Sequence, residues 1–358
     1  MDSKEPKEKH VICKYQDMRD CANCRCSDLL ECLNAEHKDQ VSSIGALKFM
    51  FERHISNLDN WAINIKGLII FHRALQNIKV NRKIIKDLSA KSHLLHPYQK
   101  KNPDGKYNIK MFVELSKQYS NYVKFYLKVC TNTEIMCKGL KNISNEVRAL
   151  RTVEILKHYE FFEAMVTQIF DIFQHSNFCK TSRLFSNLIF MCFKDLIKIY
   201  KIYYVHITEI LERFPSLNSS EAPKALIMYE NFVNLTEAIK TKANKLIYTF
   251  NFPIQLPDFY NPEKGLVDTL KVVVQSAQDG GAVSEGKLAE VASKARSGMN
   301  RDHYSAKDDE EVYFDCNVLE KFDENQHEFD KIDEKKKADT NIDLMDFISK
   351  ADFTSVGG

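Results

Sequence analysis

Apolar residues recur every three or four positions through much of the chain between residues 59 and 275, which is the spacing of one face of a helix. The stretch from Asp59 to Ile78 shows the pattern twice. One face carries Trp61, Ile65, Leu68 and Leu75, and a second carries Ile63, Ile70, Phe71 and Ala74. A helix that is apolar on two faces is usually packed by neighbours on both sides. We therefore expect an interior helix here, with Asp59 as its N-cap.

The same spacing predicts further helices. The first set is Phe112, Leu115, Tyr119, Tyr122 and Tyr126. The second begins at Leu188 and continues through Phe193, Leu196, Tyr200, Tyr203, Ile207, Ile210 and Phe214. The third is Ala225, Met228, Phe232, Leu235 and Ile239, and a brief fourth is Leu266, Leu270 and Val273. Pro215 is expected to end one helix and Pro223 to lie at the start of the next. Sustained two-residue alternation is missing from the sequence. The pattern predicts an all-α architecture of consecutive antiparallel helices, either a bundle or an α-solenoid.

The charged residues are unevenly distributed between the two parts of the chain. The 358 residues have a net charge of +2, but the part from Val272 onward holds 11 Lys and Arg against 20 Asp and Glu. The preceding part therefore carries +11, which suggests an anionic partner such as nucleic acid, an acidic protein or an anionic leaflet, and the acidic end is able to fold back on it. Large apolar residues become scarce after Gln275. We expect a flexible start over 1–9, a helical domain over 10–275, and an acidic, mostly disordered tail over 276–358.

Several classes of protein are disfavoured. The sequence contains no apolar run long enough for a transmembrane helix and no apolar segment near Met1 typical of a secretory signal. Its ten cysteines are then expected to be reduced thiols of a cytoplasmic protein. Phosphate-loop, dinucleotide-binding, GxSxG and HExxH motifs are missing, so neither an enzyme nor a cofactor is expected. A helix-turn-helix or RNP pattern is also missing, which disfavours nucleic acid as the partner.

Two clusters near the start of the chain are candidates for binding. Cys21, Cys24 and Cys26 have a partly zinc-like spacing, but this single CxxC motif is more typical of buried reduced thiols. Cations precede and overlap this cluster: Lys7, Lys9, His10, Lys14, Arg19 and Arg25. Converging cations would bind a phosphorylated inositol headgroup, at about 1 kcal/mol for each Lys or Arg near an anionic leaflet. The alternative is that these are solvated charges on an exposed face.

Four blocks in the expected order resemble the ANTH domain, the amino-terminal domain of AP180/CALM-type clathrin assembly proteins. The blocks are Asn60 to Arg73, with Trp61, Lys66 and His72; Phe112 to Phe125, with Tyr119-Ser120-Asn121-Tyr122; Phe193 to Phe214, with Lys194-Asp195 and Leu211-Glu212; and Lys224 to Phe232, followed by Pro257-Asp258-Phe259. The resemblance implies a right-handed helical superhelix that binds phosphatidylinositol 4,5-bisphosphate at the plasma membrane. It also implies a tail that recruits clathrin and adaptors, and some members bind SNARE helices as cargo.

The resemblance also assigns a lipid site. The family pattern is a Lys followed by a Lys-rich cluster that ends in Lys-His. Lys14 fits the first Lys, and the cluster position reads Cys24-Arg25-Cys26-Ser27, with Arg25 as its one cation. Lys7, Lys9 and His10 are the nearby residues expected to compensate. Two missing cations at about 1 kcal/mol each predict a headgroup affinity roughly ten- to hundredfold lower than is typical of the family.

The tail carries candidate binding motifs. The family's Asp-Pro-Phe and Asn-Pro-Phe motifs are missing, and Phe-Asp pairs begin instead at Phe314, Phe322 and Phe329. Leu344-Met345-Asp346-Phe347 fits four positions of a clathrin-box-like pattern, and Phe353 follows Asp352. Between 314 and 332 an amphipathic helix that docks on the body explains the pattern equally well.

Together these features predict a cytoplasmic, peripheral-membrane adaptor of clathrin-coated pits or vesicles. A helical scaffold that has lost lipid binding and a zinc module are the two alternatives.

Overall fold

The computed structural model describes residues 61–77, 82–90, 110–133, 135–137, 143–179, 183–252, 254–262 and 265–278, with isolated positions at 92, 95, 140, 286 and 293. All regular elements in these ranges are helices, which confirms the predicted all-α fold. The predicted flexible start, the acidic tail and every residue assigned above to lipid, metal or coat binding lie outside the described residues.

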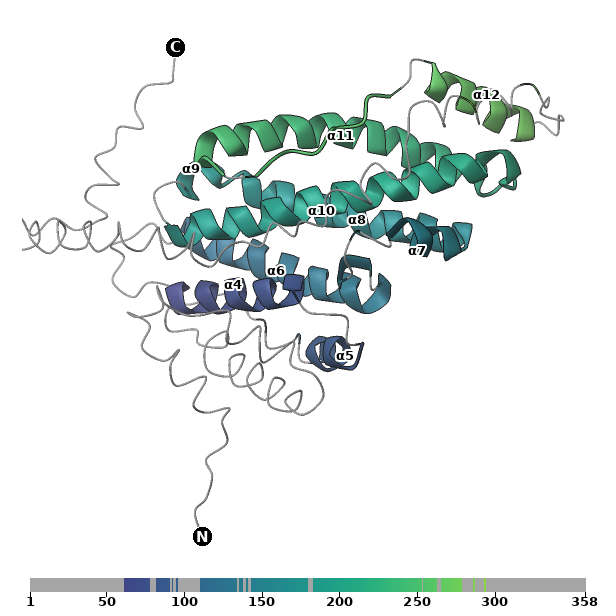
Figure 1. Cartoon of the computed structure of the whole chain (residues 1–358). Coiled ribbons are helices and arrows are strands. Elements are labelled where there is room, and N and C mark those ends of the chain that lie inside the picture. The colour runs from purple at the N-terminus through teal and green to yellow at the C-terminus, as the bar shows by residue number, and fades with distance from the viewer. Residues whose placement is uncertain are drawn as a thin grey trace, which may run out of the picture.

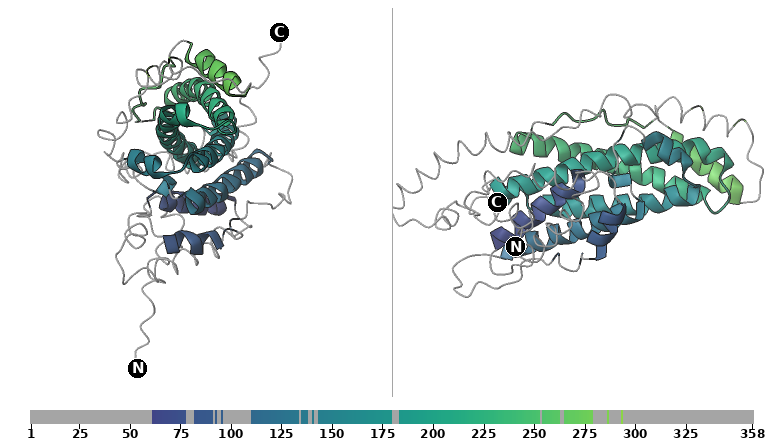
Figure 2. Two further views of the ribbon diagram at one scale, coloured as in Figure 1. Left: turned by 90° about the vertical axis from the view of Figure 1, so that its right-hand side faces the viewer. Right: turned by 60° about the horizontal axis from the view of Figure 1, so that its bottom comes forward.

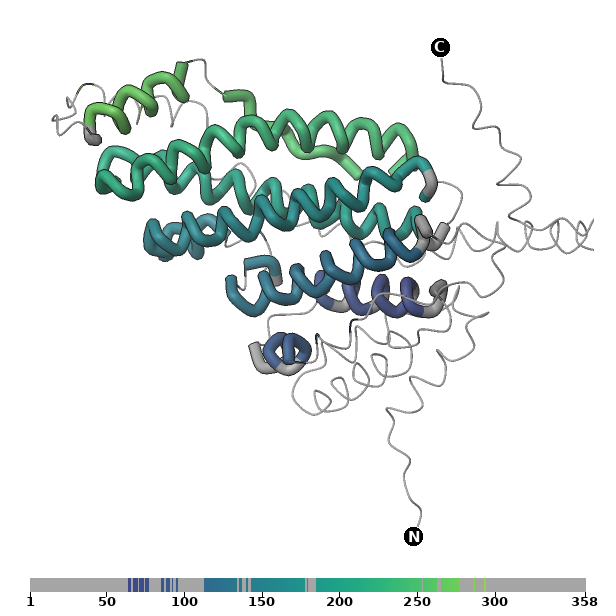
Figure 3. The backbone as a smooth tube through the Cα atoms, turned by 180° about the vertical axis from the view of Figure 1, so that it is seen from behind, coloured from purple at the N-terminus to yellow at the C-terminus, as the bar shows by residue number. Residues whose placement is uncertain are grey.

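Long helices follow one another along the chain and lie side by side (Figure 1). The elements are α4 (Trp61–Asn77), α5 (Arg82–Ala90), α6 (Lys110–Thr133), η4 (Ile135–Cys137), α7 (Ile143–Ala149), α8 (Thr152–Phe173), α9 (Ser176–Cys179), α10 (Arg183–Arg213), η6 (Phe214–Ser216), α11 (Ala222–Phe250) and α12 (Leu266–Gln278). The tube in Figure 3 shows the chain stepping from α5 at one side, through α6, α8 and α10, to α11 and α12 at the other. This order matches the expectation of consecutive helices.

Helix α10 is the centre of the packing. It contacts α4, α7, α8, α9 and α11. Figure 2 shows the stack of long helices from two further directions. The predicted apolar set of α10 is buried, including Phe193, Tyr203 and Ile210 at 0% exposure. A 31-residue helix with apolar side chains on several faces is typical of an interior helix. The other long helices therefore bury their apolar faces against α10 or against its neighbours.

The sequence pattern assigned no helix to 143–173, yet α8 is the main neighbour of both α6 and α10. Its buried residues include a regular set at alternating spacings of four and three: Ile155, Tyr159, Phe162, Val166, Ile169 and Phe173. That spacing is the same signal that identified the other helices. Helix α8 was therefore predictable from its own residues.

The ends of α10 and α11 follow local backbone chemistry. Pro215 lies in η6, directly after α10, and Pro223 occupies the first turn of α11, where its missing N–H costs nothing. Asn251 ends α11 in the left-handed conformation (φ 52°), and its N–H donates to the Ile247 carbonyl at 2.8 Å. Helix α12 runs to Gln278, so the predicted domain boundary near 275 falls in its last turn.

Candidate functional site

A buried polar cluster joins α4, α6 and α10 through five side chains: His72, Gln76, Tyr119, Tyr122 and Asp195. The Asp195 carboxylate accepts from Gln76 Nε2 at 2.7 Å and from the Tyr122 hydroxyl at 2.5 Å, and it lies 2.7 Å from His72 Nε2. His72 Nδ1 lies 3.0 Å from the Tyr119 hydroxyl. We assign Nε2–H of His72 as the donor to Asp195, which leaves Nδ1 to accept from Tyr119. These hydrogen bonds join three helices, while the Gln76 Oε1 atom is buried without a hydrogen-bond partner among the described residues.

The burial of this cluster indicates that it stabilises helix packing and does not bind a ligand. His72 and Asp195 are 0% and 1% exposed, and Tyr119 and Tyr122 are fully buried. Burial, followed by the nearby Asp195 and Cys192 charges, raises the pKa of both tyrosines well above the usual value, so their hydroxyls remain donors. The side chains of His72, Tyr119, Tyr122 and Asp195 are thus withdrawn from solvent, whereas Gln76 is partly buried. The arrangement fixes the register of α4 and α6 on α10.

A second cluster, of aromatic side chains, fixes α11 and the segment 254–262 on α10. The Tyr260 N–H donates to the Tyr200 hydroxyl at 2.7 Å, and the hydroxyls of Tyr260 and Tyr229 lie 3.0 Å apart. Tyr200 stacks on Phe232 with ring centroids 5.8 Å apart, and Phe259 packs on Tyr200 at 5.0 Å. These contacts hold the extended segment 254–262 across α10 and α11. They bring together residues that lie far apart in the sequence.

The four motif blocks therefore meet in the core. His72 comes from the first block, Tyr119 and Tyr122 from the second, and Asp195 from the third. The aromatic cluster joins Tyr200 of the third block to Phe232 of the fourth and to the Pro257-Asp258-Phe259 segment. The motifs thus specify how the helices pack, and they do not by themselves form a surface site.

Buried histidines join α8 to α10. The His158 Nδ1 and His206 Nε2 atoms lie 3.2 Å apart, and His206 Nδ1 lies 2.8 Å from the Ile202 carbonyl. Because the carbonyl can only accept, His206 donates through Nδ1–H and accepts through Nε2 from His158. Burial lowers the pKa of His158 to about 4 and that of His206 to about 3. Both rings are therefore neutral at physiological pH.

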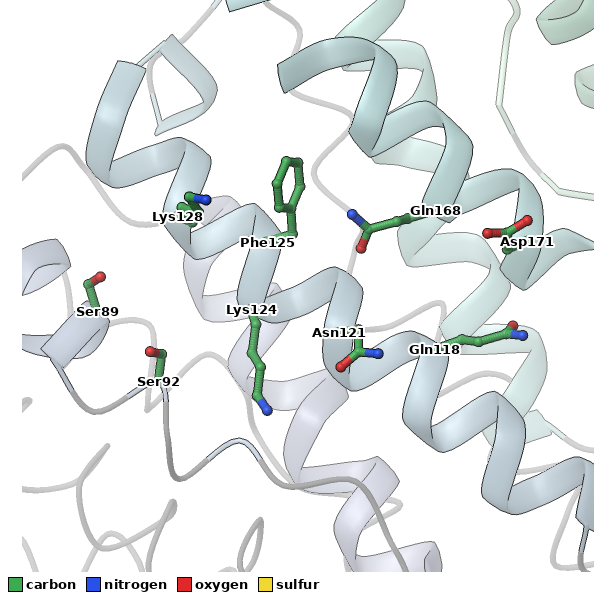
Figure 4. A pocket seen from close by; sticks show the side chains of 9 residues that line it. All are labelled: Ser89, Ser92, Gln118, Asn121, Lys124, Phe125, Lys128, Gln168 and Asp171. Atoms are coloured by element: carbon green, nitrogen blue, oxygen red, sulfur yellow. The ribbon is translucent and has the colours of Figure 1, made fainter. Parts of the chain in front are cut away.

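An open polar cleft of about 700 Å³ lies on the surface between α5, α6 and α8. Its lining residues are Ser89, Ser92, Gln118, Asn121, Lys124, Phe125, Lys128, Gln168 and Asp171. Figure 4 shows Lys124, Phe125 and Lys128 on neighbouring turns of α6, with Gln168 and Asp171 across from them on α8. Burial lowers the pKa of Lys124, and the Lys128 ammonium lies 5.9 Å from the Phe125 ring centroid. This surface can bind an anion or an acidic chain.

Comparison with known protein families decides which fold family this is. The ANTH domain family model matches residues 31–241. This chain belongs to the ANTH domain family. The resemblance drawn from the four motif blocks is thus confirmed. ANTH domains are non-enzymatic adaptor domains, which agrees with the expectation that this protein is not an enzyme.

Three curated relatives of this ANTH protein carry the name clathrin coat assembly protein AP180. The human, mouse and rat proteins are each 22% identical to it over 187 residues. The matched region is 51% of this chain and 20% of each relative. The similarity therefore covers about half of this chain and a fifth of the length of the relatives.

The described part of the ANTH domain shows neither a bilayer-spanning helix nor a metal site. None of its helices is both long enough and apolar enough to cross a membrane. Three or more metal-ligating side chains do not come together among the described residues. The candidate ligands Cys21, Cys24 and Cys26 lie outside that part of the chain, so the zinc alternative stays a prediction.

The sequence interpretation missed the cleft. Asn121, Lys124 and Lys128 line its α6 wall. Lys117 lies one turn before Asn121 on the same side of α6, which makes a stripe at helical spacings of four, three and four. These residues are polar positions of a helix whose apolar face was recognised. The signal was therefore present as the complement of that face, but only the neighbouring α5 and α8 make the stripe one wall of a cleft.

Proposed function

We propose that this ANTH protein is a peripheral membrane adaptor of endocytosis, which binds phosphoinositides of the phosphatidylinositol 4,5-bisphosphate class and links the membrane to the clathrin coat. The match of the ANTH family model to residues 31–241 carries the proposal. The relatives named clathrin coat assembly proteins support the link to clathrin. SNARE helices, known as cargo for some members of the family, are a further class of partner.

The proposed lipid site consists of Lys9, His10, Lys14 and Arg25, before the first described helix. Their positive charge would attract the phosphates of the headgroup. Two cations fewer than the family pattern predict binding about ten- to hundredfold weaker than is typical of the family. Binding should therefore be reversible and should depend on more than one of these residues.

Sedimentation with vesicles tests the lipid site. The full chain should sediment with vesicles that contain phosphatidylinositol 4,5-bisphosphate and much less with vesicles of phosphatidylcholine alone. Lys14→Ala combined with Arg25→Ala should reduce binding by about tenfold or more, since each cation contributes about 1 kcal/mol. Lys224→Ala combined with Lys245→Ala, two exposed lysines on α11, is the matched control. Equal binding by all three proteins would reject these site residues.

The proposed coat motifs are Leu344-Met345-Asp346-Phe347 and the aromatic–acid pairs at Phe314, Phe322, Phe329 and Phe353. An aromatic ring beside an acid can fill a pocket while the charge orients the chain. Leu344→Ala combined with Phe347→Ala should remove most clathrin heavy-chain binding in a pull-down with purified clathrin. Retained binding would exclude this segment as the clathrin motif.

A helical interaction scaffold without specific lipid binding is the second candidate. The observation that favours it is the sequence Cys24-Arg25-Cys26-Ser27, where the family has a basic cluster. Vesicle binding that does not change when the bisphosphorylated lipid is replaced by an equal charge of phosphatidylserine would favour the scaffold. A strict requirement for the inositide would reject it.

A further inference from the structure

The cleft between α5, α6 and α8 is formed in part by a basic stretch of the chain. Residues 82–133, which include α5 and α6, hold 11 Lys and Arg against 3 Asp and Glu. Lys117, Lys124 and Lys128 follow one side of α6, and none of them forms an ion pair among the described residues. Asp171, to which Gln174 donates at 3.4 Å, is the acidic residue of the opposite wall. This side of α6 therefore carries net positive charge, with three lysines against Glu114, which accepts from Gln118 at 3.2 Å.

The cleft also offers groups that bind a peptide. The Gln118 side chain lines the cleft and donates through Nε2 to Glu114 Oε1 at 3.2 Å, and its buried Oε1 atom has no hydrogen-bond partner among the described residues. Asn121 is exposed and can donate and accept, and Ser89 and Ser92 add hydroxyl groups at the other side. Phe125 is half-buried and provides an apolar surface beside Lys128, while Lys124 extends to the other side of α6 (Figure 4). This combination suits a chain that carries both acids and aromatic rings.

One segment of the protein matches that description. Residues 308–315 read Asp-Asp-Glu-Glu-Val-Tyr-Phe-Asp, with five acids, two aromatic rings and no base. Along α6, Lys117 and Lys128 are about 16 Å apart at 1.5 Å per residue. Eight extended residues span about 23 Å. The segment is therefore long enough to place its acids against the lysines and a ring against Phe125.

The connecting chain is long enough as well. About 30 residues separate Gln278, the end of α12, from Asp308. Such a length has a typical end-to-end distance of about 30 Å and a maximum near 100 Å. Helix α10, the longest element described, is about 46 Å long. A tethered segment can therefore reach the cleft at a high effective concentration.

We propose that residues 308–315 dock in the cleft between α5, α6 and α8 of the same chain, with their acids on Lys117, Lys124 and Lys128. Docking covers Phe314, one of the candidate coat-binding residues. The adaptor is then withheld from the coat until another anionic surface displaces the segment. That consequence rests on the proposed function, whereas the docking itself does not.

Zero-length carbodiimide cross-linking of the full chain, read by mass spectrometry, tests the docking. Dilute protein should give amide links between the acids of 308–311 and Lys117, Lys124 or Lys128, with a yield independent of protein concentration. Lys124→Glu combined with Lys128→Glu should lower the yield of the remaining link to Lys117 by about fivefold, because exposed ion pairs each contribute modestly. Lys224→Glu combined with Lys245→Glu changes the net charge equally and should leave the yield unchanged.

A charge swap separates docking from damage to the fold. Asp308→Lys combined with Asp309→Lys, added to the Lys124→Glu and Lys128→Glu variant, should restore cross-linking with the charges exchanged. The proposal would be overturned if the links were spread evenly over the exposed lysines of α11. It would also be overturned if Lys124→Glu combined with Lys128→Glu left the cross-linking yield to Lys117 unchanged. A yield that rises with protein concentration would assign the cleft to a second copy instead. Vesicle binding that requires Lys124 and Lys128, without any link to 308–311, would assign it to an anionic membrane.

Discussion

Single buried polar residues hold this fold in register. Asp195 accepts hydrogen bonds from α4 and α6, and its side chain and that of His72 are almost fully buried. Such a residue contributes little net energy while its network is complete, but its loss leaves several donors unsatisfied. Asp195 is therefore more sensitive to substitution than its polar character alone suggests.

Asp195→Ala should destabilise the domain by about 3–5 kcal/mol, because it leaves His72, Gln76 and Tyr122 without their acceptor. Thermal unfolding followed by circular dichroism at 222 nm measures the change. Asp171→Ala removes an exposed carboxylate from α8 and should change stability by less than about 1 kcal/mol. Similar unfolding temperatures for the two variants would contradict the role given to the buried cluster.

The histidine pair predicts a loss of stability in acid. The pKa values of His158 and His206 lie below the unfolded value of about 6.5, so the unfolded chain binds more protons as the pH falls. The stability that the two neutral rings contribute is fully present above pH 6.5. It is lost as the pH falls through about 4 for His158 and about 3 for His206. Burial is the first cause for both rings. The Glu154 charge opposes it at His158, and Lys157 reinforces it there.

Chemical denaturation at a series of pH values measures this effect. The free energy of unfolding should fall by up to about 1.4 kcal/mol per pH unit for each imidazole between pH 6.5 and 4. His158→Gln combined with His206→Gln should flatten that slope, whatever its effect on stability at neutral pH. An unchanged slope would show that other groups dominate the acid response.

At the scale of elements, Arg213 links the end of α10 to the turn between α7 and α8. Its guanidinium donates to Glu209 Oε1 at 2.7 Å, to the Leu150 carbonyl at 2.6 Å and to the Arg148 carbonyl at 2.8 Å. Glu209 and Arg213 lie four positions apart on α10, and such a pair contributes about 0.3 kcal/mol on a helix surface. The hydrogen bonds to the two carbonyls are expected to contribute more to stability, because they satisfy carbonyl groups at the end of α7.

Arg213→Lys should therefore loosen the corner between α7 and α8, because an ammonium cannot reach all three acceptors. Hydrogen exchange of amides in 143–152 should become about tenfold faster, with little change in the middle of α10. Lys201→Arg, a conservative change elsewhere on α10, is the control. Unchanged exchange in 143–152 would show that packing of Ile143 and Val147 holds α7 without Arg213.

At the scale of the whole molecule, binding and folding depend on different forces. The described body is held by apolar burial around α10, which salt screens little, whereas the proposed contacts with headgroups and with the acidic segment are ionic. The charge division between the helical part and the end of the chain has no role in the core. The two properties should therefore respond differently to ionic strength.

Raising the salt concentration from about 0.05 M to 0.5 M should weaken binding to inositide vesicles by about tenfold or more, because the Debye length falls several-fold. The unfolding temperature should change by only a few degrees over the same range. Sedimentation and thermal unfolding on one preparation measure both. Salt-independent vesicle binding would instead indicate insertion of apolar groups.

The sequence alone determined the class of fold and its family. Helical spacing of apolar residues is a local property, and it located α4, α6, α10, α11 and α12 because each helix must bury a continuous face. The missed α8 has the same spacing. The motif blocks likewise identified the family, since they preserve the packing residues of its core.

Only the tertiary structure decided which distant residues meet. His72, Tyr119 and Asp195 are separated by 47 and 76 positions, and nothing in their local sequence pairs them. The basic stripe of α6 becomes one wall of a cleft because α5 and α8 pack beside it. Local periodicity determines which face of a helix is buried, whereas the choice of neighbour depends on how all the faces pack together.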